Sequence, residues 1–223
     1  LAMLCLLQAA APGTPFIYAP VLAVIDPRSG RYSAGAIESG LTGAACTEMA
    51  RYYGLPAEAS GLGTDHHVPG IQAGYERAAG GMLPALSWPD ILVGPGLLGG
   101  AMILSLEQLM IDVEVFRLYK RAWQGITIDD DKWLEDVIDQ VGPGGNYLAE
   151  MSTVTGIRNG EWYVSKFGVH DTFEGWEAAG RPLLLEEARE KVRQILATHE
   201  PLPLDDAVER ELERIQVRAG AEG

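Results

Sequence analysis

Cysteine is scarce in this sequence, and its spacing excludes two kinds of small scaffold. The 223 residues include only Cys5 and Cys46, which lie far apart and form no CxxC pair. Neither a disulfide framework nor a cysteine-based zinc site can be built from them. A reducing compartment suits such a chain, and we therefore expect a cytoplasmic protein.

Basic residues are also few, which disfavours partners that carry many negative charges. Lys and Arg total 17 against 31 Asp and Glu, so the formal net charge is −14. Nucleic-acid binding relies on clustered Lys and Arg, and an anionic membrane surface attracts the same residues. We therefore expect neither nucleic acid nor a membrane as a partner.

Long apolar runs are missing as well. The opening LAMLCLLQAA is too short to span a bilayer and lacks the basic residues that begin a signal peptide. The sequence starts without Met and within a helical pattern. We expect it to be the C-terminal part of a longer protein.

Two catalytic signatures and one ion-binding signature are absent. Neither a Walker GK[ST] nor a GxSxG elbow occurs, which leaves nucleotide hydrolysis and Ser-based hydrolysis unsupported. The glycine runs GPGLLGG and GPGG predict tight turns. Asp129-Asp130-Asp131 lacks the Gly and Glu of an EF-hand at the required positions, and it predicts a charged helix N-terminus.

Strand-like and helix-like segments alternate through the first 125 residues. β-Forming residues bounded by turn residues predict the strands, and apolar residues at helical spacing predict the helices. The predicted strands are 15–25, 57–62 and 89–96, and the predicted helices are 35–53, a stretch from Pro69 to Met82, and 105–123. Ser105-Leu106-Glu107-Gln108 has the pattern of a capping box at the start of the last helix.

Three strand–loop–helix units at close spacing predict an α/β fold with parallel strands and right-handed crossovers. Either an open doubly wound sheet or part of a (β/α)8 barrel fits this pattern. In both folds ligands bind at the loops that leave the C-terminal ends of the strands. The segment TDHHVPG at 64–70 is such a loop.

The rest of the chain is predicted to be helical. The expected helices are 129–141, 172–180, 183–200 and 204–218. We therefore divide the chain into residues 1–125, which carry the β/α units, and residues 126–223, a helical extension packed on them.

Asp65, His66 and His67 are the candidate functional residues of the loop at 64–70. Asp and His suit zinc or iron, but adjacent histidines point in different directions and no third ligand stands at useful spacing. A histidine pair without function is the second alternative. A substrate or cofactor loop is the interpretation that position and composition favour, and no bound metal is expected.

Several phrases, in order over residues 12–200, resemble the C-terminal half of the trimethylamine methyltransferase family. They include PGTPFIYAP, DPRSGRYSAGAIES, TDHHVPGIQAGYE, VGPGGNYL and FEGWEAAG. The resemblance implies the later strands of a (β/α)8 TIM barrel followed by C-terminal helices. It also implies methyl transfer from a small methylated amine to the Co(I) of a corrinoid (cobalamin) held by a partner protein, without a tightly bound cofactor.

The resemblance also implies which branch of the family this sequence is similar to. In the archaeal trimethylamine enzymes the site holds pyrrolysine, which would align at or beside His67, and no such residue is present here. The chain is therefore similar to the non-pyrrolysine branch, whose members include glycine betaine methyltransferases. A quaternary ammonium already has a neutral amine as its leaving group, so no covalent activation is required.

On this basis the expected catalytic residues are Asp65, His66 and His67. The expected substrate-binding residues are Tyr18, Glu38, Gln72, Gly94 and Gly96. Asp65 is expected to orient a histidine or to attract the cationic substrate. Relatives often carry a His or an aromatic residue near Val93-Gly94, where this sequence has VGPG, and that departure leaves the substrate open.

Two rival interpretations stay open at this stage. A zinc-dependent methyltransferase of the methanol type would need zinc ligands that the two cysteines do not provide. A truncated barrel without activity could instead serve as a binding or assembly subunit, because half a barrel exposes sheet edges and apolar helix faces. The same exposed surfaces would allow a homo-oligomer.

Overall fold

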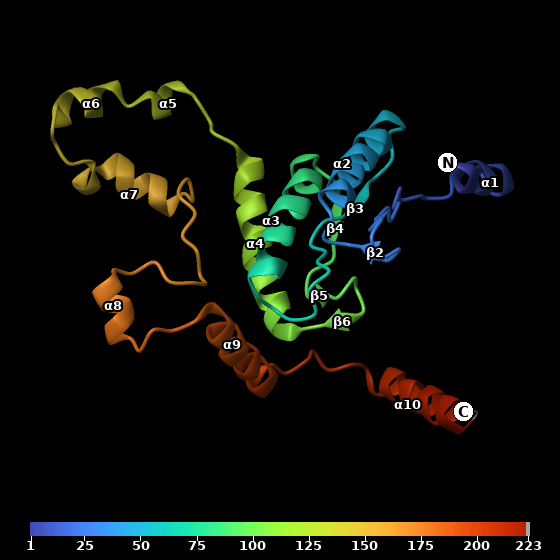
Figure 1. Ribbon diagram of the computed structural model, residues 1–223. Helices are drawn as coiled ribbons and strands as arrows, with labels where there is room; N and C mark the ends of the chain where they lie inside the picture. Colours follow the sequence, from blue (N-terminus) through green and yellow to red (C-terminus); the bar gives the residue numbers. More distant parts are fainter. Residues whose placement is uncertain (222–223) are drawn as a thin grey trace. The chain divides into compact units, whose positions relative to one another are not determined.

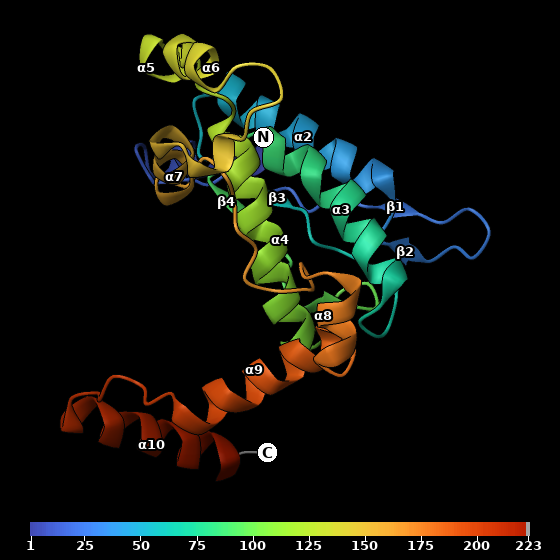
Figure 2. The ribbon, with the colours of Figure 1, turned by 90° about the vertical axis from the view of Figure 1, so that its left-hand side faces the viewer.

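The computed structural model describes residues 1–221, which combine helices with short strands. Helix α3 (Ile71–Leu86) packs against both α2 (Ile37–Tyr52) and α4 (Leu106–Gln124) (Figure 1; Figure 2). Helices α2 and α3 also pack against the strand β3 (Glu58–Ser60), which pairs with β4 (Ile91–Val93). The predicted alternation of strand and helix in residues 57–124 is confirmed.

The central strands are parallel, as the pattern predicts. β3 pairs with β4 with Ala59 opposite Leu92, and an isolated parallel bridge joins Tyr18 to Ala57. Tyr18 donates its amide to the Pro56 carbonyl at 2.8 Å, and Glu58 donates to the Tyr18 carbonyl at 3.0 Å. Three chain segments therefore run side by side in the same direction, which is the arrangement of an α/β fold.

The strand predicted over residues 15–25 is wrong as a single element. Parallel pairing is confined to the Tyr18 bridge, and β1 (Val24–Ile25) instead pairs antiparallel with β2 (Tyr32–Ser33). Pro20 interrupts the run because proline has no amide hydrogen for a ladder. The turn in between is a hairpin turn, in which Gly30 donates to the Asp26 carbonyl at 2.8 Å.

Small residues let α2 approach α3 and β3 closely. A Cβ on Gly40 would overlap the carbonyl of Gly80, and a Cβ on Gly43 would lie 3.2 Å from the Ser60 carbonyl oxygen. The adjoining apolar core contains the buried residues Leu62, Ala85 and Tyr119. Glycine at the helix contact thus permits the short separation between backbones, at the usual entropic cost.

A buried ion pair joins α3 to α4. Arg77 and Asp112 are 1% and 0% exposed, and Arg77 Nε lies 3.3 Å from Asp112 Oδ1. The Gln108 side-chain amide and the Gly96 amide also donate to Asp112, at 2.8 and 2.7 Å. Arg77 donates to the Leu97 carbonyl, while its Nη1 has no hydrogen-bond partner among the described residues. Asp112 therefore supplies most of the negative charge that neutralises the buried Arg77 guanidinium.

The predicted cap of α4 is present, but the reciprocal half of the capping box is not. Ser105 Oγ accepts from the Gln108 amide at 3.1 Å. The Gln108 side chain does not return to the Ser105 amide, because it donates to Asp112, and the Ser105 amide donates to the Gly96 carbonyl at 2.9 Å. A charged acceptor within reach competes well for the side-chain amide.

Within residues 1–221, the chain before α2 holds one further helix, α1 (Ala2–Ala10), and the β4–α4 connection forms the hairpin of β5 (Leu97–Leu98) and β6 (Ile103–Leu104). The described residues that follow α4 form helices and loops, without further strands. The elements are α5 (Asp130–Trp133), α6 (Glu135–Val141), η1 (Tyr147–Ala149), α7 (Met151–Arg158), α8 (Phe173–Ala178), α9 (Leu184–Thr198) and α10 (Asp206–Ala221). Sequence patterns had not indicated η1 and α7.

The single helix predicted over residues 129–141 is wrong, because it breaks at Leu134. This residue has φ 52 and ψ 30, a left-handed conformation that ends α5 and begins α6. Left-handed backbone is costly for leucine unless its surroundings favour it. The break lets Trp133, Leu134 and Ile138 line one apolar cavity of about 680 Å³ together with η1 and α7.

The chain divides into two compact units, Leu1–Val192 and Arg193–Gly223. The boundary expected after residue 125 stays a prediction. Within residues 1–221, no helix has both the length and the apolar character that crossing a membrane requires.

Glu114 of α4 anchors the segment that follows α7. Its Oε1 accepts from Tyr163 Oη at 2.5 Å, from Ser165 Oγ at 2.7 Å and from the Lys166 amide at 3.1 Å. Burial alone would raise the pKa of Glu114, but these hydrogen bonds outweigh it and leave the pKa below its usual value. Burial and the Glu114 carboxylate together raise the pKa of Tyr163 to about 12.

We predict that Asp112→Ala lowers the free energy of unfolding by about 3–5 kcal/mol, because it leaves the buried Arg77 without its counter-ion. Urea unfolding followed by circular dichroism measures this difference. Asp139→Ala, at an exposed position of α6, is the matched control and should change it by no more than about 0.5 kcal/mol. A loss below about 1 kcal/mol for Asp112→Ala would contradict this account.

We predict that Glu114→Gln destabilises the protein by about 1–2 kcal/mol at neutral pH, since charge-assisted hydrogen bonds are replaced by neutral ones. Because the folded-state pKa of Glu114 lies below the unfolded value of 4.5, the difference is full above about pH 4.5. It should disappear as the pH falls through the folded-state pKa. Unfolding curves of both proteins between pH 3 and pH 7 test this, and a pH-independent difference would contradict it.

Candidate functional site

The segment Thr64–His67 lies just after β3, at the C-terminal end of a parallel strand, as the sequence analysis expects. The β5–β6 hairpin supports it from one side, because Gly100 donates its amide to the Thr64 carbonyl at 2.9 Å and Gly99 donates to the His66 carbonyl at 2.8 Å. The four residues are therefore held by backbone hydrogen bonds that do not depend on their side chains.

Asp65 is fixed by the chain that enters α2. Its Oδ2 accepts from Ser33 Oγ at 2.5 Å, and its Oδ1 accepts from the amides of Ala34 and Gly35 at 2.7 and 3.3 Å. The carboxylate is thus oriented by β2 and the following residues, and the hydrogen bonds of the described residues do not join it to His66 or His67. Its negative charge remains at the site.

The two histidines point in different directions, which adjacent residues on an extended segment are expected to do. His66 is half-buried, and its Nδ1 lies 2.7 Å from the Val68 carbonyl oxygen and 3.4 Å from the Val68 amide nitrogen. His67 is exposed and packs beside Gly99, where an added Cβ would lie 3.2 Å from His67 Cδ2. Gly99 also has φ +57, so this position favours glycine both for its backbone conformation and for the close approach of His67.

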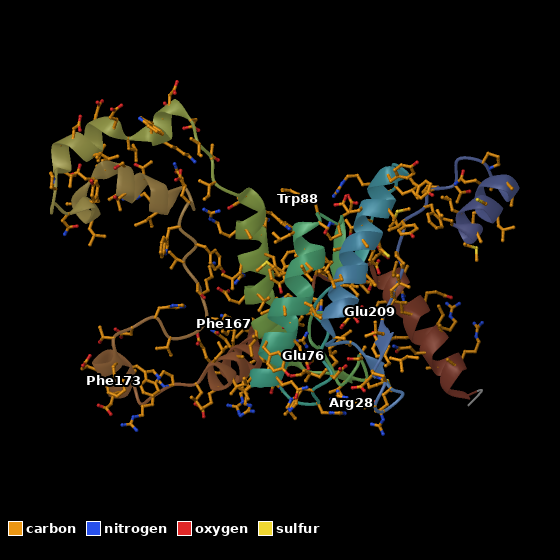
Figure 3. All side chains as sticks on the ribbon, turned by 45° about the horizontal axis from the view of Figure 1, so that its top comes forward. Arg28, Glu76, Trp88, Phe167, Phe173 and Glu209 are labelled. Carbon is orange, nitrogen blue, oxygen red and sulfur yellow. The ribbon has the colours of Figure 1, made fainter. Side chains whose placement is uncertain are left out.

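Glu76 is a central residue of the site that the sequence analysis missed. The residue is 8% exposed, and its carboxylate accepts from Thr64 Oγ1 at 2.5 Å, from the Asp65 amide at 3.0 Å and from Gln72 Nε2 at 2.8 Å. It projects from the first turns of α3, at the opposite end of the helix from Trp88 (Figure 3). The sequence signal that could have indicated Glu76 is its position as a carboxylate on the mostly apolar buried face of α3.

An acidic cavity of about 690 Å³ brings several of the predicted residues together. Asp65, Glu38 and Gln72 all line it, and Asp26 and Glu76 join them. Its single basic side chain, Arg28, lies on the hairpin turn (Figure 3) and pairs with Asp26 at 2.6 Å. That guanidinium holds the pKa of Asp26 well below its usual range. Four carboxylates against one paired cation favour a positively charged ligand.

A second cavity of about 250 Å³ contains His67. Asp65, Ser33 and Asp26 line both cavities, so the Ser33–Asp65 hydrogen bond stands between them. Arg31 and Tyr32 of the hairpin line the second cavity with His67. The two cavities therefore share one wall that carries the carboxylates of Asp26 and Asp65, and His67 lines only the second cavity.

Three predicted substrate residues do not line either cavity. Tyr18 is half-buried in the parallel bridge to Ala57. Gly96 donates its amide to Asp112, and a Cβ on Gly94 would meet the Leu62 amide at 3.3 Å. The two glycines, at φ +80 and +116, allow the chain after β4 to pack against buried groups.

Residues 94–99 match the dinucleotide pattern GxGxxG. That fingerprint places its glycines between a strand and the first turn of a helix. Here the run follows β4 but enters the β5–β6 hairpin, and α4 begins only at Leu106. The predicted role in tight turns is therefore confirmed. No group of three or more His, Cys, Asp or Glu within residues 1–221 has a geometry that could hold a metal ion.

Comparison with known proteins identifies the family. A family model described as trimethylamine methyltransferase (MTTB) matches residues 1–223. Trimethylamine methyltransferase MttB of Methanosarcina barkeri is 34% identical over 216 residues, which cover 96% of this chain and 43% of that protein. Glycine betaine methyltransferase of Desulfitobacterium hafniense strain Y51 is 32% identical over 223 residues, which cover 100% of this chain and 46% of that protein.

The chain spans less than half of the length of these relatives. The match nevertheless runs through every residue that lines the two cavities, as well as through the parallel strands that position them. The chain belongs to the trimethylamine methyltransferase family.

Proposed function

We propose that this protein transfers a methyl group from a quaternary or tertiary methylated amine to the Co(I) of a corrinoid carried by a partner protein. The observation that carries the proposal is the acidic cavity at the C-terminal end of β3, which is lined by the carboxylates of Asp26, Glu38 and Asp65 and by one basic side chain, Arg28. Family membership supports the reaction class, and the charge of the cavity supports a cationic donor. We further propose that the β/α units belong to a (β/α)8 barrel, where this edge holds the active site.

The cavity suits a methylated ammonium ion in its charge. A quaternary ammonium has no N–H group, so a protein recognises it through electrostatic attraction and through aromatic faces. Tyr75 lines the acidic cavity beside the carboxylates, and Tyr32 lines the second cavity. The carboxylates of Asp65 and Asp26 are held by hydrogen bonds, so they do not need to reorganise when a cation enters.

The proposed step needs little covalent help from the protein. The electron pair of Co(I) forms the bond to the methyl carbon, the carbon–nitrogen bond breaks, and its electron pair remains on nitrogen as a neutral amine. No proton moves when the donor is quaternary. A tertiary donor reacts as its protonated ammonium ion, and the N–H proton stays on the neutral secondary amine that leaves. The protein contributes by attracting the cation, orienting its N–CH3 bond and excluding water. We propose that His67, which lines the adjoining cavity, borders the methyl group.

A binding or assembly subunit without catalysis is the second candidate. The specific observation in its favour is the exposure of large apolar side chains, such as Ile71 at 91% and Met102 at 85%, which suit contact with another protein. The two candidates make different predictions for cobalt methylation, whereas both allow a cation to bind.

We predict that the protein, mixed with a Co(I) corrinoid protein, forms methyl-Co(III) with at least one methylated amine. The visible spectrum reports this change, with glycine betaine, other betaines, carnitine and trimethylamine as donors. His67→Ala should lower the rate by at least about tenfold through loss of orientation. His170→Ala, an exposed histidine outside both cavities, is the matched control and should keep the rate.

An unchanged rate in His67→Ala would exclude His67 from the site. Binding of a donor without any cobalt methylation would favour the non-catalytic candidate.

We predict that Glu38→Gln weakens the binding of a methylated ammonium ion about three- to tenfold, because one carboxylate charge of the cavity is lost. Calorimetric titration at low salt measures the dissociation constant. Glu48→Gln, on the same helix but outside the acidic cavity, is the control and should bind normally. Equal affinities for all three proteins would mean that the cation binds elsewhere.

A further inference from the structure

We propose that Glu76 is the positioning residue of this site, holding the Thr64–His67 segment in place through hydrogen bonds rather than binding the substrate through its charge. This inference rests on the proposed function for its kinetic consequences, but not for its structural ones. It assigns a role to a carboxylate that borders the acidic cavity and yet is almost completely withdrawn from solvent.

Each oxygen of Glu76 already has a donor. Oε2 accepts from Thr64 Oγ1 and from the Asp65 amide, and Oε1 accepts from Gln72 Nε2. Two of these donors belong to the segment after β3, and the third lies one turn earlier on α3 itself. A carboxylate satisfied in this way is oriented towards the segment, and its charge is partly offset by its donors.

The hydrogen bonds continue from Glu76 into the candidate catalytic residues. Thr64, which is 1% exposed, donates to Glu76 and accepts from the His66 amide at 3.1 Å. The Asp65 amide is bound by Glu76, while the Asp65 carboxylate is bound by Ser33 and the next two residues. Glu76 thus anchors the backbone on one side of Asp65, and the entry to α2 anchors its side chain on the other.

The surrounding chain leaves room for this carboxylate. A Cβ added to Gly35 would overlap the Glu76 side chain, so glycine lets the entry to α2 pass directly over the carboxylate. Gly35 also donates its amide to Asp65 Oδ1 at 3.3 Å. The packing therefore brings Glu76, Asp65 and the start of α2 together within a single hydrogen-bonded unit.

Positioning and charge can be separated by substitution. In Glu76→Gln the side-chain oxygen can still accept from Thr64 and Asp65, and the Gln72 amide can turn to accept from the new Nε2. This variant keeps the hydrogen bonds and loses the charge. Glu76→Ala loses both. A residue that acts by position should tolerate the first change and not the second.

The first measurement is steady-state methyl transfer with the full chain and a corrinoid protein. We expect Glu76→Gln to keep kcat and KM within about threefold, and Glu76→Ala to lower kcat by about 30- to 100-fold with a smaller change in KM, because the loop is misplaced. Glu48→Ala, on the exposed side of α2, is the control. A Glu76→Gln variant as impaired as Glu76→Ala, with a raised KM, would overturn the proposal in favour of direct cation binding.

The second measurement does not depend on the reaction. Hydrogen exchange of the Asp65, His66 and His67 amides should be at least about tenfold faster in Glu76→Ala and nearly unchanged in Glu76→Gln. Unchanged exchange in Glu76→Ala would overturn the positioning role. If exchange responds as expected while even the unsubstituted protein methylates no cobalt, the proposed function fails and the positioning role stands.

Substitutions of Thr64 test the same hydrogen bond from its other end if Glu76→Ala does not fold. Thr64→Val removes the hydroxyl with little change in volume, whereas Thr64→Ser keeps it. We expect faster exchange at Asp65 and His66 in Thr64→Val, with normal exchange restored in Thr64→Ser. Equal exchange in these two variants would overturn the proposal.

Discussion

Two adjacent buried charges on α3 determine how the loops after both parallel strands are held. Glu76 binds the segment after β3, through Thr64 and the Asp65 amide. Arg77 binds the segment after β4, through the Leu97 carbonyl and through Asp112, which also accepts from the Gly96 amide. A buried charge requires partners. If either loop moved away from α3, the buried charge of Glu76 or Arg77 would therefore lose its partners.

This arrangement explains why the candidate site residues lie together at one edge. The loop after β3 brings Asp65 and His67 beside the hairpin that carries Asp26, and the shared Ser33–Asp65 hydrogen bond separates an acidic cavity from the one that contains His67. Asp26, Glu38 and Asp65 line the acidic cavity, which is where we propose that a methylated ammonium ion binds. Charge and geometry thus favour the same class of ligand.

Much of the fold could be predicted because its determinants are local. Helical periodicity and terminators predict α2 and α3 closely, and a Ser105 cap begins α4. The failures occur where a distant contact or an unusual backbone decides the structure. The strand expected at 15–25 lacks a continuous partner, and Leu134 adopts a left-handed conformation that propensity does not indicate. The Gln108 side chain does not accept from the Ser105 amide, because its own amide group donates to Asp112.

By itself the sequence determined the alternation of strands and helices, the acidic balance, the family resemblance and the candidate loop at Asp65–His67. Each follows from residues close together in the chain or from a pattern of short phrases. The tertiary structure alone decided that Glu38 and Gln72 join Asp65, that Tyr18, Gly94 and Gly96 do not line the cavities, and that Glu76 is central. Hydrogen bonds such as Ser33–Asp65 connect residues 32 positions apart, and only the folded packing of β2, β3 and α3 selects them.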